Sequence, residues 1–335
     1  MIHTDFLEKT IDECIENGIP ERIAVRIGQG ERVIYDTYRG GVDETTLFDM
    51  ASVTKIMATT PLALIALDSG RLKLDDTVDK FYSTSKPITI KNLLTHTIGI
   101  GHKALNKEGN SYANIAEKIL DIPQDIPIGK DVRYSCPGFI LLGKIIEKIY
   151  DKPFNECFDD FVAKPLGLQK TSFLPSSGEN VVNSNLDKEK RGVVNDYNCR
   201  FLGGVAGNAG LFSSLSDVTK YVGFLRNKGK PLISEQTFLA ATRNHTPGMS
   251  ESRGLGFLYV DDRYKQTGGL FDDGAIGHCG HTGQSVFLDY RSGLYVIILS
   301  DATIATVKKY GRERYDAVMD MRARIHNSIK CSMGI

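Results

Sequence analysis

Residues 48–70 read FDMASVTKIMATTPLALIALDSG, and this stretch decides our interpretation of the fold. Ser52 and Lys55 stand three positions apart, and mainly apolar residues follow as far as Gly70, which predicts a helix over residues 52–69. Residues three apart on a helix share one face, so the Lys55 amine can reach the Ser52 hydroxyl. A serine hydroxyl needs such a base to become a nucleophile, and a lysine can serve when burial or nearby cations lower its pKa.

The same four-residue pattern occurs again at Ser83 and Lys86, so the pattern alone carries little weight. Pro87 follows this second copy, and a residue before proline disfavours the helical conformation. We therefore expect no helix that would hold Ser83 and Lys86 together. For Ser52 the alternative is an ordinary helix-capping serine, since short motifs often match by chance.

The composition is that of an ordinary globular protein. The chain has 335 residues, of which 41% are hydrophobic and 24% are charged. At about 150 residues per domain, this length predicts one large or two medium domains. Lys plus Arg and Asp plus Glu each total 41, so the formal net charge is zero. We expect no nucleic-acid partner and no polybasic membrane anchor; the expected partner is a small-molecule or peptide substrate.

The N-terminal residues contain no apolar run of the length that a signal peptide needs. The densest apolar run, residues 56–67, is interrupted by Thr59, Thr60 and Pro61 and is too short to span a bilayer. We expect a cytoplasmic protein without a membrane span, while an exported form with a trimmed signal stays open, as does the oligomeric state. The six cysteines show no Cys-x-x-Cys pair, which argues against a zinc ribbon and predicts mostly buried thiols.

Strand-like segments gather at both ends of the chain, and helical segments fill the middle. The predicted strands are 22–28, 32–38, 254–260, 285–290 and 294–299. The predicted helices are 4–17, 52–69, 89–97, 112–120 and 137–149, with one long closing helix over 306–328. This order predicts an α+β fold: an antiparallel β-sheet flanked by helices and built from both termini, with an inserted helical region. Residues 1–50 and 245–335 would form the α/β sheet region, and residues 51–244 the mainly helical region with loops.

Two further segments carry chemistry. Tyr134-Ser135-Cys136 precedes Pro137, which suits the first turn of a helix. The segment GHTGQS, residues 280–285, lies just before a predicted strand. Together with Ser-x-x-Lys, these segments parallel the three sequence elements that β-lactamases and penicillin-binding proteins share.

In chain order, the segments FDMASVTK, LLTHTIG, YSCPGFILLGKIIEKI, AKPLGLQKTSF, LGGVAGNAGLFSSLSDVTKY and GHTGQS resemble the serine β-lactamase-like family. This family includes penicillin-binding proteins, class C β-lactamases, D-amino-acid carboxypeptidases and several esterases. The resemblance extends from about residue 20 to about residue 300. It implies a β-lactamase/transpeptidase-like fold, one catalytic unit, and acyl-enzyme formation on an ester, a D-amino-acid peptide or a β-lactam. It implies no metal and no organic cofactor.

The resemblance also assigns roles to individual residues. Ser52 corresponds to the acylated nucleophile, Lys55 to its base partner, and Tyr134 to the tyrosine that passes a proton to the leaving group. A tyrosine beside a lysine cation would have a lowered pKa and become a usable acid–base group, so we expect a lowered pKa for Tyr134. His96, in LLTHTIG, is interpreted as a structural histidine rather than as a base.

His281 falls where the family has Lys or His in its third motif, and a protonated imidazole there would pair with a substrate carboxylate. Thr282 and Gly283 continue this motif along the strand that edges the site. The resemblance places the backbone N–H groups of Ser52 and Gln284 in the oxyanion hole.

Cys136 stands where the tyrosine motif usually ends in Asn, and a thiol is a weaker hydrogen-bonding group than an amide. Cys136 at a helix start beside Lys55 would be prone to oxidation; the alternative is an inert thiol that only fills space. Together, Cys136 and His281 favour an esterase or peptidase over an efficient β-lactamase. The alternative function is a catalytically weakened, penicillin-binding-type ligand sensor, which would bind or acylate once and then stop.

Overall fold

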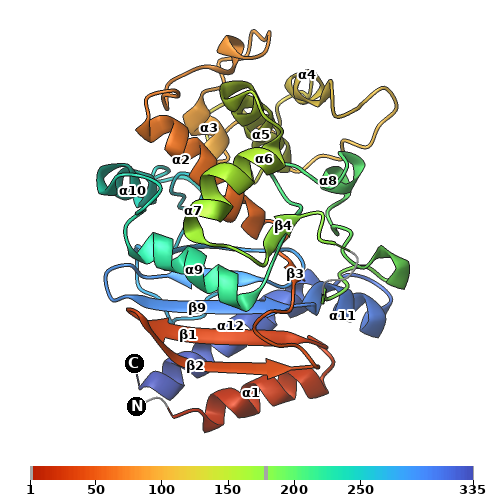
Figure 1. Ribbon diagram of the computed structural model, residues 1–335, viewed down its shortest axis with the longest axis vertical. Coiled ribbons are helices and arrows are strands. Elements are labelled where there is room, and N and C mark those ends of the chain that lie inside the picture. Colours follow the sequence, from red (N-terminus) through yellow and green to blue (C-terminus); the bar gives the residue numbers. More distant parts are fainter. Residues whose placement is uncertain (1–2, 177–179, 335) are drawn as a thin grey trace.

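The computed structural model describes residues 3–176 and 180–334. Its centre is a six-stranded antiparallel sheet in the order β2-β1-β9-β8-β7-β6 (Figure 1). The N-terminal strands pair directly with a C-terminal strand, for example Val25 opposite Ile298. The predicted joining of the two termini in one antiparallel sheet is therefore confirmed. The strands are β1 Ile23–Gln29, β2 Arg32–Arg39, β6 Leu258–Tyr259, β7 Ile276–Cys279, β8 Ser285–Leu288 and β9 Leu294–Ser300.

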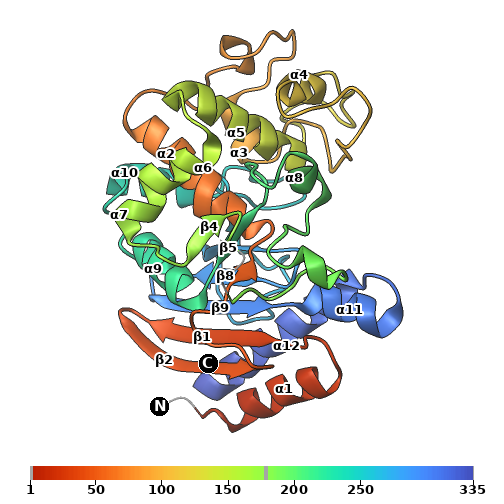
Figure 2. The same cartoon turned by 45° about the vertical axis from the view of Figure 1, so that its right-hand side comes forward.

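Helices cover both faces of this sheet, and a mainly helical region is inserted between β2 and β6 (Figures 1 and 2). One face carries α1 and α12, which lie side by side; α9 crosses the other face. A small second sheet, in the order β3-β5-β4, lies within the inserted region. Its strands are β3 Phe48–Asp49, β4 Thr171–Phe173 and β5 Leu211–Ser213. The helices of this region are α2 Thr60–Asp68, α3 Ile90–Leu94, α4 Ile115–Leu120, α5 Cys136–Tyr150, α6 Phe154–Phe158, α7 Lys164–Leu166, α8 Tyr197–Phe201, α9 Leu215–Arg226 and α10 Glu235–Thr242.

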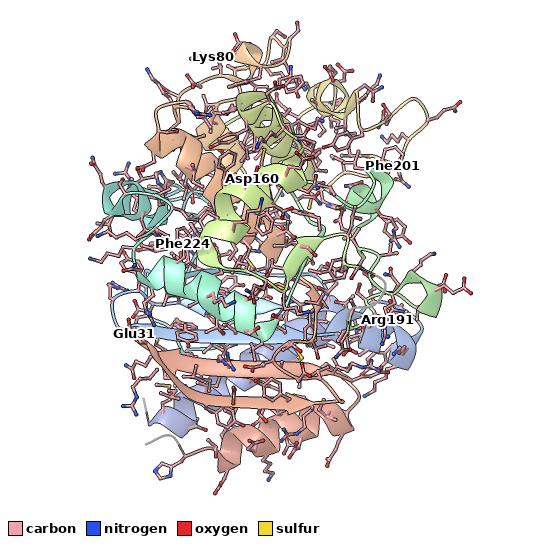
Figure 3. All side chains as sticks on the ribbon, viewed as in Figure 1. Glu31, Lys80, Asp160, Arg191, Phe201 and Phe224 are labelled. Atoms are coloured by element: carbon pink, nitrogen blue, oxygen red, sulfur yellow. The ribbon has the colours of Figure 1, made fainter. Side chains whose placement is uncertain are left out.

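The central strand β9 separates two hydrophobic cores. Successive side chains of a strand point to opposite faces of the sheet. Val296 and Ile298 accordingly belong to the core under α1 and α12, whereas Ile297 and Leu299 belong to the larger core shared with the helical region. All seven residues of β9 are buried. Exposed charged side chains such as Glu31 and Lys80 lie at the periphery (Figure 3).

The helix predicted over residues 52–69 is confirmed, with one irregularity. A π-helical segment, Lys55–Thr59, precedes α2, and the Thr60 N–H bonds to the Lys55 carbonyl oxygen five residues back. Pro61 follows and has no N–H to continue the ladder. Such π-helical turns often occur at functional sites.

The C-terminal part differs from the prediction in two ways. The single closing helix is instead two helices, α11 Ala302–Tyr310 and α12 Tyr315–Met333. Gly311 ends the first of them with a positive φ of 68°, a conformation that glycine adopts without strain. β7 was not predicted, because it is buried along its whole length and shows no polar alternation. In the part of the chain that the structure describes, no helix is long and apolar enough to cross a membrane.

Candidate active site

The start of the predicted helix brings Ser52 and Lys55 together. Lys55 Nζ donates a hydrogen bond of 2.9 Å to Ser52 Oγ and another of 2.9 Å to the Asn208 carbonyl oxygen. The Lys55 side chain is completely buried, which restricts it to this geometry. Within the described residues, the backbone N–H of Ser52 has no acceptor, so it is free to bind an oxygen atom of a substrate.

Tyr134 completes this group from a distant part of the chain. Its hydroxyl donates a 2.6 Å hydrogen bond to Ser52 Oγ across 82 positions of sequence. Tyr134 lies just before α5, whose N-cap Ser135 accepts a hydrogen bond from the Gly138 N–H at 3.1 Å. The Ser52 hydroxyl therefore contacts an ammonium group and a phenol at once, which is the arrangement needed to remove and return a proton.

The expected lowering of the Tyr134 pKa is wrong. Burial raises the pKa of Tyr134, and the attraction of Lys55 for the phenolate only partly offsets this. For Lys55, burial lowers the pKa, but Cys136 and Tyr134 raise it, and the net shift is upward. Desolvation of the phenol is a larger effect than the lysine cation, and it cannot be read from the spacing of residues in the sequence. Lys55 and Tyr134 titrate as an interacting pair.

Cys136 lies beside Lys55, as expected. It is the first residue of α5, is buried, and places its sulfur 3.7 Å from Lys55 Nζ. A hydrogen bond with Cys136 also raises the pKa of His102. Five of the six cysteines are buried and Cys331 is exposed, in agreement with the predicted buried thiols. Among the described residues, no group of three or more His, Cys, Asp and Glu side chains could hold a metal ion.

The segment after β7 is hydrogen-bonded to Asp49, which lies three positions before Ser52. Thr282 Oγ1 donates a 2.8 Å hydrogen bond to the Asp49 carbonyl oxygen, and the Gln284 side-chain amide donates to the same oxygen. Gly283 has a φ of 130°, and a Cβ there would collide with Ser300. The turn is therefore held against the start of the Ser52 helix by side-chain hydrogen bonds from Thr282 and Gln284, and Gly283 allows its backbone conformation. The sequence did not predict these bonds.

His281 does not join the group around Ser52. Its Nε2 lies 3.1 Å from Glu313 Oε2, its ring stacks on Tyr315, and its side chain is 44% exposed. In the described structure it makes no side-chain hydrogen bond, ion pair or ring contact with Ser52 or Tyr134. Glu313 would also neutralise the charge that His281 gains on protonation, which weakens the expectation that His281 attracts a substrate carboxylate.

His278, three residues earlier, is the histidine that lies beside Tyr134. It is 3% exposed, and its ring centroid lies 6.0 Å from that of Tyr134. The sequence contains two consecutive His-x-Gly triplets, at residues 278–280 and 281–283. From the sequence, the third motif is assigned to the second triplet. The strand β7 carries the first triplet into the site, and Gly280 packs so closely that an added Cβ would lie 2.7 Å from the Met50 carbonyl oxygen.

A buried ring of polar groups surrounds Tyr134. The His96 ring lies 4.6 Å from the Tyr134 ring, and the Arg253 guanidinium lies 5.6 Å from it. His96 Nδ1 accepts the Ser135 N–H at 3.0 Å, which supports the structural role expected for this histidine. Arg253 is only 4% exposed and pairs with Glu251 through one nitrogen. Its Nε and Nη1 find no partner among the described residues.

Burial, together with nearby cations, favours the neutral form of His96 and His278. Burial holds the pKa of both His96 and His278 well below the usual value, and the charges of Arg253 and Lys55 lower it further. Sequence reasoning missed Arg253 because nothing in the pattern SRGLGF distinguishes it from a surface arginine. Only the fold places it against a tyrosine 119 positions earlier in the chain.

Comparisons with known proteins show which family the chain and its fold resemble. The family model described as Beta-lactamase matches residues 7–318. Esterase EstB from Burkholderia gladioli is 25% identical over 366 aligned positions, covering 88% of this chain and 90% of EstB. A protein assigned as a D-alanyl-D-alanine carboxypeptidase from Escherichia coli O157:H7 is 27% identical over 303 positions, covering 76% of this chain and 69% of that protein. The octameric penicillin-binding protein homologue from Pyrococcus abyssi superposes with a TM-score of 0.74 at 21% identity, covering 92% of this chain and 77% of that one.

Proposed function

The chain belongs to the β-lactamase family and is a hydrolase of that type, and we propose that it acts through an acyl-enzyme formed on Ser52. One observation carries the proposal: Ser52 Oγ lies 2.9 Å from Lys55 Nζ and 2.6 Å from Tyr134 Oη. Lys55 comes from the helix that follows Ser52 and Tyr134 from the segment just before α5. Lys55 is buried, and both side chains are held by hydrogen bonds to Ser52. A serine held in this way has the partners that nucleophilic catalysis needs.

In the first step, Ser52 Oγ attacks the carbonyl carbon of the substrate. The Lys55–Tyr134 pair must first lose one proton, and the proton-deficient pair then accepts the Ser52 proton. Tyr134 passes that proton to the leaving group as the acyl bond breaks. In the second step, a water molecule attacks the acyl-enzyme, its proton goes to the same pair, and Ser52 is regenerated.

The negative charge that develops on the carbonyl oxygen needs backbone donors. We assign one to the free Ser52 N–H and the second to an N–H of the turn between Gly280 and Gln284. The hydrogen bonds from Thr282 and Gln284 to Asp49 fix this turn relative to Ser52. Donors that are already in place when the charge forms are the most effective, because they need no reorganisation during the reaction.

Arg253 acts in this scheme as a positioning residue for Tyr134. Its buried guanidinium faces the Tyr134 ring, and only one of its nitrogens pairs with Glu251. A cation at this distance stabilises the phenolate relative to the phenol. The groups that face Tyr134 are the cations Lys55 and Arg253, the thiol Cys136, and the neutral His96 and His278.

We propose an ester as the preferred substrate. Cys136 replaces an amide that would bind a peptide-like side chain, and His281 is turned away from Ser52 towards Glu313. His278, which lies beside Tyr134 instead, has a pKa held well below the usual value by burial, so it is neutral and pairs poorly with a carboxylate. These differences weaken contacts to peptides and carboxylates and leave the nucleophile in place. The similarity to esterase EstB supports this ranking.

The proposal is tested with a panel of short-chain p-nitrophenyl esters and with a penicillin, on the parent protein and on Ser52→Ala. Turnover of an ester by the parent, abolished in Ser52→Ala, is the expected result. Intact mass after incubation with the penicillin separates the alternatives. A persistent single adduct without turnover of any ester would favour the ligand sensor. Ester turnover that survives in Ser52→Ala would end the acyl-enzyme proposal.

A further inference from the structure

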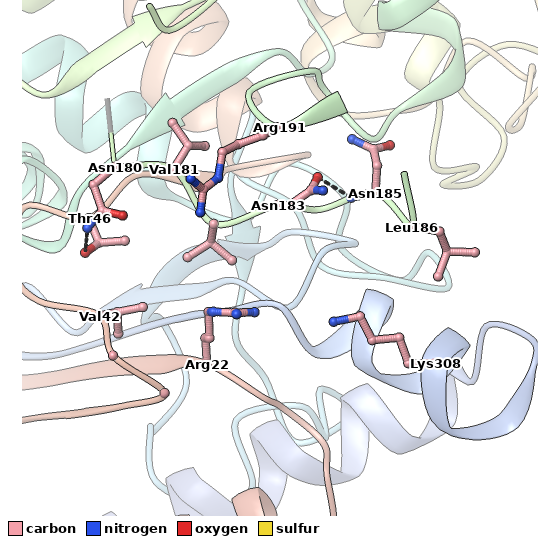
Figure 4. A pocket seen from close by; sticks show the side chains of 13 residues that line it. Arg22, Val42, Thr46, Asn180, Val181, Asn183, Asn185, Leu186, Arg191 and Lys308 are labelled. Carbon is pink, nitrogen blue, oxygen red and sulfur yellow. Dashed lines mark hydrogen bonds between the residues drawn. The ribbon is translucent and has the colours of Figure 1, made fainter. Parts of the chain in front are cut away.

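A cavity of about 570 Å³ lies outside the group around Ser52, between the sheet and the segment of residues 180–191 (Figure 4). Its walls come from the start of β1, the turn after β2, this segment and α11. None of the residues that line it contacts Ser52, Lys55 or Tyr134 in the described structure. The cavity is therefore distinct from the candidate active site.

Three cations converge on this cavity from three separate parts of the chain. Arg22 and Lys308 approach from the sheet side, and Arg191 approaches from the opposite wall (Figure 4). Among the described residues, no acidic side chain lines the cavity. Asn180 and Asn183 lie on the same wall as Arg191, and their amides each donate one hydrogen bond within the protein, to Thr46 Oγ1 and to the Asp187 carbonyl oxygen.

The acidic partners of these cations leave a net positive charge. Arg22 pairs with the buried Asp301 at 3.2 Å, and Lys308 pairs with Glu21. In the described structure, Arg191 has no acidic partner and no hydrogen bond. Arg22 is thus held in place by an ion pair behind the wall, while Arg191 carries a charge that nothing offsets.

The remaining lining is apolar. The cavity is also lined by four apolar side chains and two glycines: Val42, Val181, Val182, Leu186, Gly40 and Gly41. A pocket that combines a few fixed polar groups with an apolar lining is the usual form of a small-molecule site. An arginine binds carboxylate and phosphate oxygens through two parallel N–H groups, which gives both strength and orientation.

We propose that this cavity binds a small organic anion, in which a carboxylate or phosphate group is attached to a short apolar body. The charged group meets Arg191, Arg22 and Lys308, and the apolar body meets the valines and Leu186. The binding needs no chemical step at Ser52, so it stands or falls independently of the proposed hydrolase activity.

Titration calorimetry with phenylphosphonate tests the proposal, because this probe has the right charge and size and contains no hydrolysable ester. The expected result is saturable binding of one molecule per chain, weakened by added salt. Benzyl alcohol, which is similar in shape but uncharged, is expected to give no binding. Arg191→Glu should weaken phenylphosphonate binding about tenfold or more.

Arg32→Glu is the matched control, since Arg32 is an exposed arginine at the other end of the β1–β2 hairpin. It should leave the affinity unchanged. Lys308→Met provides a second variant that removes a cation without introducing an acid, and it should weaken binding less than Arg191→Glu. Equal affinity in the parent and Arg191→Glu would overturn the proposal, as would an absence of binding to the parent up to about 10 mM.

Discussion

The two Ser-x-x-Lys sequences share one pattern and have opposite structures. Ser52 and Lys55 lie on a buried helical turn, with Nζ and Oγ 2.9 Å apart. Ser83 is exposed in an irregular segment, and Lys86 Nζ instead donates 2.6 Å to the Ile122 carbonyl oxygen. The prediction that the second copy would not form a helix is confirmed, for the reason given: Pro87 follows it.

The two lysines also differ in their protonation. Burial lowers the pKa of Lys86, and only Asp121 acts against it. The pKa of Lys55 is raised, because Cys136 and Tyr134 outweigh a more complete burial. The lysine with the lowered pKa is thus Lys86, whose amine does not bond to the serine of its own motif. The neighbours of the lysine, and not the motif, decide how it titrates.

The largest expected effect comes from removing each serine in turn. We expect Ser52→Ala to lower kcat/KM for an ester by about a thousandfold or more, because the nucleophile itself is lost. Ser83→Ala should leave the rate unchanged, since Ser83 is exposed and lies outside the site. Steady-state kinetics on both variants provides the measurement. Equal losses in the two variants would remove the distinction between the copies.

Replacing each lysine by methionine keeps much of the side-chain volume and removes the charge. Lys55→Met should lower kcat by about a hundredfold or more, because the Ser52 proton loses one of its two acceptors. Lys86→Met should keep full activity and cost about 1 kcal/mol of unfolding free energy through the lost hydrogen bond to Ile122. Chemical denaturation and kinetics on the same samples separate the two effects. A fully active Lys55→Met would contradict the assigned role.

The two His-x-Gly triplets allow the same kind of comparison. We expect His278→Gln to lower kcat/KM about tenfold or more, because His278 lies beside Tyr134, whereas His281→Gln should change it less than about threefold. The ion pair between His281 and Glu313 is exposed, so it contributes little to the stability of the protein. The reverse ranking would restore His281 to the third motif and show that the histidine was correctly chosen from the sequence.

The smallest effect concerns pH. Because the pKa values of Tyr134 and Lys55 are both raised, only a small fraction of the pair lacks a proton near neutral pH, and this fraction grows with pH. We therefore expect kcat/KM to increase from about pH 7 and to be still increasing at about pH 9. Arg253→Gln removes a cation that favours the phenolate, so the rising limb should move to higher pH by about one unit.

Arg253→Lys keeps the charge and should stay near the parent profile, which distinguishes an electrostatic role from a purely structural one. If the rising limb of the kcat/KM profile lies at the same pH in the parent and in Arg253→Gln, then Arg253 does not influence the pKa of Tyr134. A rate that falls steadily between pH 7 and pH 9 would contradict the proposed role of the pair itself.

Local patterns explain what could be predicted of the fold. The helix at Ser52, the β1–β2 hairpin and strand β9 were found because their signals lie within a few residues. The single closing helix predicted over residues 306–328 is two helices in the structure, because Gly311 ends α11 inside an otherwise continuous helical pattern. β7 was missed because a short, fully buried strand has no alternation to detect.

The sequence by itself determined that Ser52 and Lys55 share a helix face, since that relation depends only on a spacing of three residues. It also determined the family, through the order of six short segments. Only the tertiary structure decided which histidine reaches Tyr134, that Arg253 covers its ring, and that burial outweighs the lysine charge on the phenol. These relations join residues 79 to 144 positions apart in the chain, so no local pattern contains them. Desolvation, in addition, depends on everything that packs around a group.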